Sequence, residues 1–202
     1  MARMRLLFLV TLFLVAQSTT TAAQEYGTNL RLFGQFILGV AGSVDGETEA
    51  GGFSQDFEGD LDPSIGFGAG ADFGLHEYFA LGGIFRYFSI SPEDAEDSSS
   101  AIDIDALPRL RYPFEQGEVY FAIPVGLTIF IPDEGDAEVG WNLNFVLGGL
   151  YKLTEQFGLF AEVGYFLHFA SSSEEDPFSG TEIDVSSTIG QIGIAIGAAY
   201  IN

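Results

Sequence analysis

The stretch Ser64-Ile65-Gly66-Phe67-Gly68-Ala69-Gly70-Ala71-Asp72-Phe73-Gly74-Leu75 alternates between two kinds of side chain. Its odd positions are Ile, Phe, Ala, Ala, Phe and Leu, and its even positions are Ser, Gly, Gly, Gly, Asp and Gly. Successive side chains of a strand point to opposite faces, so this pattern predicts a strand with one wholly apolar face. The opposite face would carry only small or polar residues.

Seven further segments repeat this one-sided alternation, so the sequence predicts eight strands. Beside 64–75 they are 29–44, 78–91, 101–114, 118–131, 139–153, 157–170 and 188–201. Each is long enough for the roughly 9–11 residues of a tilted membrane-spanning strand. The connections alternate between short turns and long acidic loops; the predicted loops are 45–63, 92–100, 133–138 and 171–185. Pro108 and Pro113 fall inside one predicted strand, where a bulge is the usual way to accommodate proline.

The N-terminus has the pattern of a secretory signal peptide. Arg3 and Arg5 precede an apolar run over 6–16 that is too short to span a bilayer, and small residues follow it. We predict cleavage after Ala23, with a membrane anchor as the alternative. No Cys follows the apolar run, which excludes a lipid-modified N-terminus. The whole chain has no Cys, which excludes a disulfide-stapled fold.

The chain is strongly acidic. It has 29 acidic residues, and removal of the signal leaves five basic ones, which are Arg31, Arg86, Arg109, Arg111 and Lys152. This balance excludes nucleic acid as a partner, because phosphate binding requires clustered Lys and Arg. All five basic residues fall on the polar face of the predicted strands. In a soluble domain Lys and Arg belong on the outside, so here the apolar face is predicted to be the outer one.

A closed barrel explains this inverted arrangement. It hydrogen-bonds every backbone group without leaving a sheet edge, as lipid requires, and an even strand number with short turns at one end matches outer-membrane barrels. Aromatic residues near both ends of the apolar face predict two interfacial girdles. Those near the short turns are Phe73, Phe79, Tyr112, Phe114, Tyr151 and Tyr200, and those near the long loops are Tyr87, Trp141 and Phe169. The alternative is a soluble eight-stranded barrel of the lipocalin or avidin type, which would require a Gly-rich sheet surface in water.

The architecture resembles the small outer-membrane β-barrels typified by the OmpA membrane domain and OmpX, over residues 24–202. The resemblance implies an all-β fold, a closed eight-stranded antiparallel up-and-down transmembrane β-barrel in the bacterial outer membrane. It also implies periplasmic termini and contact with outer-membrane lipids, and we expect a monomer. Such barrels usually end in an aromatic residue, whereas this chain ends Tyr200-Ile201-Asn202.

The interior of an eight-stranded barrel is just wide enough for side chains to fill. The polar faces carry five basic residues and four acidic ones, which is close to neutrality. Buried charges require partners, so the sequence predicts an interior ion-pair network. Its predicted members are Arg31, Asp72, Arg86, Asp103, Asp105, Arg109, Arg111, Lys152 and Glu162. This network is either the core of the barrel or a gated polar path for ions.

No catalytic residue, cofactor site or metal site is predicted. His168 and Ser171 are spaced so that they fall on opposite faces of a strand, which disfavours a lipid A-modifying enzyme. The acidic loops lack the glycine of a calcium-binding loop, which leaves solvated surface or diffuse binding of divalent cations. The segment 66–71 matches a dinucleotide fingerprint by letters only, because no helix follows it.

We expect a non-enzymatic protein with a structural or surface-interaction role through four acidic extracellular loops, with a narrow porin-like channel as the alternative.

Overall fold

The computed structural model describes residues 30–91, 99–132, 137–175 and 182–202. These residues form ten strands of a single antiparallel sheet. The strands are β1 (Leu30–Ala50), β2 (Phe53–Leu61), β3 (Ser64–His76), β4 (Phe79–Ile90), β5 (Ser99–Phe114), β6 (Gly117–Ala122), β7 (Val125–Ile131), β8 (Glu138–Lys152), β9 (Phe157–Glu175) and β10 (Glu182–Ile201). Among the described residues, no helix is long and apolar enough to cross a membrane. The predicted signal peptide, residues 1–23, lies outside them.

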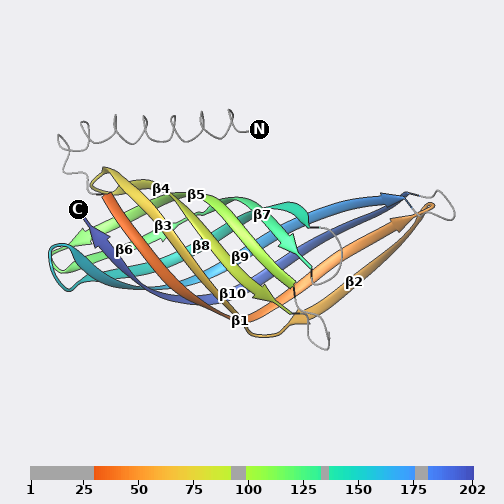
Figure 1. Cartoon of the computed structure of the whole chain (residues 1–202), viewed down its shortest axis with the longest axis horizontal. Coiled ribbons are helices and arrows are strands. Elements are labelled where there is room, and N and C mark those ends of the chain that lie inside the picture. The colour runs from red at the N-terminus through yellow and green to blue at the C-terminus, as the bar shows by residue number, and fades with distance from the viewer. Residues whose placement is uncertain (1–29, 92–98, 133–136, 176–181) are drawn as a thin grey trace.

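The sheet closes on itself because β10 pairs with β1 in antiparallel register. Around the ring the order is β1, β3, β4, β5, then β6 with β7, β8, β9 and β10. β6 and β7 share one position, since both pair with β5 on one side and with β8 on the other. The fold is therefore the predicted eight-stranded antiparallel up-and-down barrel, with its strands tilted around a common axis (Figure 1).

Prolines interrupt the barrel wall between β6 and β7. The gap is Ile123-Pro124, and it lies opposite Pro108 of β5, where the Ile123 N–H donates to the Pro108 carbonyl at 3.1 Å. The register of the β5 pairing is the same on both sides of the gap. The expected bulge is therefore absent from the described β5 ladders. The ladder is instead interrupted at Pro124, which has no N–H to donate.

The outward face of the ring is apolar. Ile65, Phe67, Phe121 and Ile194 are 57, 56, 38 and 47% exposed, whereas Arg109 is only 3% exposed. A soluble barrel would have the opposite arrangement, with the apolar residues enclosed and the guanidinium group in water. The alternative of a soluble carrier is therefore wrong.

The faces of β1 exchange above Gly39. Val40 is an extra residue in the β1–β10 ladder, a β-bulge that shifts every later side chain to the opposite face. As a result Val44 packs against the interior cluster of buried apolar residues. Unbroken alternation over the predicted strand 29–44 would place its even positions, Gly42 and Val44 included, outward with the apolar set. For these two residues that prediction is wrong, because one inserted residue shifts the alternation.

Two of the predicted loops are largely strand. Residues 45–63 contain the upper part of β1 and all of β2, joined by Gly51 and Gly52, which both have positive φ. β9 and β10 likewise continue into the predicted loop 171–185. Together these segments form a four-stranded sheet in the order β9-β10-β1-β2, which we call the extension (41–61, 170–175 and 182–190). It projects beyond the rest of the barrel (Figure 1).

The outward apolar face leads to a test. Leu147 of β8 is 59% exposed and lies along the strand between Trp141 and Tyr151. We expect Leu147→Arg to lower the free energy of unfolding in lipid vesicles by about 2–4 kcal/mol, because hydrocarbon does not solvate a guanidinium group. Phe53→Arg, in the extension, should change it by less than about 0.5 kcal/mol. Urea titration followed by Trp141 fluorescence measures both, and equal losses would contradict a lipid-facing surface.

Candidate functional site

The interior contains a group of charged side chains near the short turns, which we call the turn-end cluster. It consists of Arg31, Asp72, Arg109, Glu118, Tyr120 and Glu162. Arg31 is in register with Asp72 on the neighbouring strand, and its Nη2 lies 2.8 Å from Asp72 Oδ2. Arg31 Nη1 lies 2.5 Å from Glu118 Oε1, and Arg109 Nη1 lies 3.0 Å from Asp72 Oδ2. One buried carboxylate therefore neutralises two guanidinium groups.

Tyr120 joins this cluster to Glu162. The Tyr120 hydroxyl donates to Glu162 Oε1 at 2.7 Å, and the Arg109 Cζ lies 4.3 Å from the centroid of the Tyr120 ring. The same guanidinium group lies 5.4 Å from the ring centroid of Phe33. Stacking on aromatic faces suits the weakly hydrated, planar guanidinium group. Aromatic rings therefore fill the space that the ion pairs leave.

A second group of polar side chains lies toward the extension, and we call it the loop-end cluster. It consists of Arg86, Asp103, Asp105, Thr128, Asn142, Asn144 and His168. Arg86 forms an ion pair with Asp105, whose Oδ1 accepts a hydrogen bond from Asn142 Nδ2 at 2.8 Å. Asn144 Nδ2 donates to Asn142 Oδ1 at 2.9 Å. These contacts connect β4, β5 and β8 across the lumen.

Asp103 is the second carboxylate of the loop-end cluster. It accepts a hydrogen bond from Thr128 Oγ1 at 2.7 Å and lies 3.2 Å from His168 Nε2. Ser171 is exposed on the extension, so the structure does not bring it together with the buried His168. Over the described ranges, no three His, Asp or Glu side chains are placed so that they could hold a metal ion.

Two predicted members of the network lie at its margin. Lys152 is exposed where β8 ends, just before the short turn, so its side chain reaches the rim and its assignment to the interior is wrong. Arg111 bonds backbone at the β3–β4 turn, with Nε 3.1 Å from the Glu77 carbonyl oxygen and Nη2 3.0 Å from that of His76. Its Nη1 lies 3.9 Å from Glu118 Oε2.

Sequence reasoning missed Glu118 and Tyr120. Glu118 is the second residue of β6 and was taken only as the start of the predicted strand 118–131, although it alternates with the outward Val119 and Phe121. The same alternation places Glu118 and Tyr120 inside, so the pattern contained the signal. With Lys152 at the rim, Glu118 brings the carboxylates of the network to five, against the four arginines Arg31, Arg86, Arg109 and Arg111.

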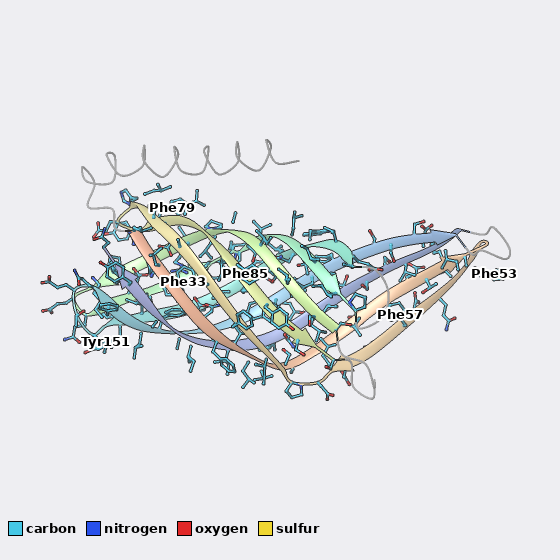
Figure 2. All side chains as sticks on the ribbon, viewed as in Figure 1. Phe33, Phe53, Phe57, Phe79, Phe85 and Tyr151 are labelled. Carbon is cyan, nitrogen blue, oxygen red and sulfur yellow. The ribbon has the colours of Figure 1, made fainter. Side chains whose placement is uncertain are left out.

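The predicted girdle residues lie on the outer surface. All nine are exposed or half-buried. Trp141 and Phe169 stack with their ring centroids 4.1 Å apart, and Phe157 packs against Tyr200 with centroids 5.3 Å apart. Figure 2 shows Tyr151 toward the end with the short turns, far from Phe53 at the tip of the extension. The contact of these rings with lipid headgroups stays a prediction.

The shared carboxylate of the turn-end cluster gives a second test. We expect Asp72→Asn to lower the free energy of unfolding by about 3–5 kcal/mol, because it leaves Arg31 and Arg109 buried without their shared anion. Glu155→Gln, in an exposed turn, is the control and should have almost no effect. Urea titration in detergent micelles measures both. A loss below about 1 kcal/mol would contradict a network that depends on Asp72.

No protein-family model and no curated protein matches this chain. Solved structures do match it. The outer membrane protein OprG from Pseudomonas aeruginosa superposes with a TM-score of 0.65 at 14% identity, covering 86% of this chain and 95% of OprG. Ail of Yersinia pestis (TM-score 0.39, 14% identity, 84% and 98% covered) and the neisserial surface protein NspA (0.41, 15%, 82% and 96%) match less well. From the OprG match and the closed ring, the chain has the fold of the small outer-membrane β-barrel proteins.

Proposed function

We propose that this protein is a monomeric, non-enzymatic barrel of the bacterial outer membrane that presents the extension at the cell surface for interactions. The observation that carries this proposal is the exchange of faces at the Val40 bulge. Below the bulge the outward side chains are apolar. Above it the outward side chains of β1 include Asp45, Glu47 and Glu49, while Val44 packs inward.

This exchange marks the level at which hydrocarbon would end. Carboxylates on an outward face are costly within a bilayer and free of that cost in water. Phe169 is in register with Thr188, which is in register with Asp45. The stacked Phe169 therefore lies on the same outward face as the first outward carboxylate, two strands away from it, and aromatic residues favour the lipid–water interface.

The filled lumen supports a structural role for the barrel. Arg31, Arg86, Arg109, Asp72 and Asp105 are all engaged in buried ion pairs within the interior. A narrow polar path for ions is the second candidate. The observation that favours it is a set of buried polar atoms in the described interior without a hydrogen-bond partner, namely Gln35 Oε1, Arg86 Nε, Arg109 Nε and His168 Nδ1.

Conductance distinguishes these two functions. We expect the refolded protein in planar bilayers to carry no steady open-channel current, because the ion pairs and rings occupy the lumen. Glu162→Gln should leave the bilayer equally silent, and Glu155→Gln on the exposed turn is its matched control. A steady current that changes with Glu162→Gln, and not with Glu155→Gln, would replace the structural role by a channel.

The orientation of the barrel has its own test. The chain has no Cys, so a single introduced Cys is the only thiol that can be labelled. Ser54→Cys, in the extension, should react with a membrane-impermeant maleimide on intact cells. Gln156→Cys, in the short turn between β8 and β9, should react only after the outer membrane is permeabilised. Labelling of Gln156→Cys on intact cells would contradict periplasmic turns and termini.

A further inference from the structure

β2 lies at the margin of the extension (Figure 1). Among the described residues, all nine of its residues pair with β1, and no strand pairs with its other side. Alternate residues along the whole of β2 therefore direct their backbone N–H and C=O groups away from β1, toward the side without a neighbouring strand. Such an edge is a template on which another chain adds as a strand through main-chain hydrogen bonds.

The outward side chains of β2 determine the charge of that added strand. They are Ser54, Asp56, Glu58 and Asp60, all exposed. Glu58 lies directly opposite Asp45 in the register with β1, and Asp56 lies directly opposite Glu47. Like charges in opposite positions destabilise a sheet. The sequence has no Lys or Arg in 41–63 or 170–190, so no basic residue within the extension neutralises them.

The inward side chains of β2 determine which residues of an added strand must be apolar. Phe53 and Phe57 are 84 and 39% exposed, whereas Leu61, at the base of β2, is buried. Figure 2 shows both phenylalanines on the extension, beyond the body of the barrel. A neighbouring strand with apolar residues at alternate positions would cover these rings. Its other residues would then lie beside the carboxylates.

We propose that the free edge of β2 binds an extended cationic polypeptide, in which Lys or Arg alternates with apolar residues, as an additional strand. This inference rests on the proposed function, because the extension must lie in water to be reached, and it names the chemistry of the partner. A second copy of this chain is a poorer occupant. Pairing of β2 with another β2 would place two rows of carboxylates side by side.

The first experiment uses the wild-type barrel in lipid nanodiscs and a fluorescent peptide as long as β2 that alternates Lys and Val. Binding is followed by fluorescence anisotropy. Two further peptides carry N-methyl groups on one or the other alternate set of backbone nitrogens. Only one set of N–H groups points at β2, so one methylated peptide should bind at least about tenfold more weakly than the other. Equal binding of the two methylated peptides, or no binding of the parent peptide, would overturn the proposal.

The second experiment reverses the charge of the edge. The variant Asp56→Lys/Glu58→Lys/Asp60→Lys should bind the Lys–Val peptide at least about tenfold more weakly and gain affinity for a Glu–Val peptide. Its matched control is Glu77→Lys/Glu115→Lys/Glu155→Lys, which changes the net charge equally at the short turns and should keep wild-type binding. If both triple variants lost the same affinity for the Lys–Val peptide, binding would depend on net charge and not on the edge of β2, and the proposal would be overturned.

Two outcomes separate this inference from the proposed function. A disulfide-linked dimer of Ser54→Cys, formed without peptide in nanodiscs that each hold one barrel and are then mixed, would assign the edge to self-pairing and overturn the inference. Peptide binding in nanodiscs does not depend on which side of a cell membrane the extension faces. If Gln156→Cys rather than Ser54→Cys were labelled on intact cells, only the proposed function would be contradicted. If the peptide did not bind in nanodiscs, only this inference would be contradicted.

Discussion

The seam between β1 and β10 is the constraint on which the rest of the structure depends. It converts an open sheet with two edges into a ring in which each strand except the appended β2 has two neighbours, as a sheet in lipid requires. The seam is closely packed. A Cβ at Gly197 would lie 2.3 Å from the Gly34 carbonyl oxygen and 2.3 Å from the Phe160 ring, so only glycine fits there.

Closure with eight strands encloses a narrow interior. Because the outer face is apolar, the charged side chains of the strands must lie in this interior. Arg31, Arg86 and Arg109 are therefore taken out of water, which is tolerable only with carboxylates and rings beside them. The turn-end and loop-end clusters provide these carboxylates and rings at the two ends of the interior. In the first Asp72 serves two arginines, and in the second Asp105 is held by Arg86 and Asn142.

The sequence predicted the eight strand positions of the ring, its closure and the inward direction of most charges, because alternation with period two is a local property of each strand. It failed where alternation is interrupted. Val44 was misplaced because one extra residue at Val40 exchanges the faces. Lys152 was misplaced because a residue at a strand end reaches the rim whatever its parity. The segment 45–63 was assigned to a loop from its acidic, Gly-rich composition, although Phe53, Phe57 and Leu61 alternate with polar residues in β2.

The seam also has a consequence for the order of folding. Arg31 is paired with Ile201, so the first described strand has its partner in the last one. Contacts between residues so distant along the chain form slowly, because the whole intervening segment must first be gathered. The chain emerging from the ribosome therefore gives β1 its neighbours β2 and β3 early, but the other edge of β1 has no partner until β10 has been synthesised. Until then the sheet cannot close, and its apolar face is not yet the outer wall of a ring.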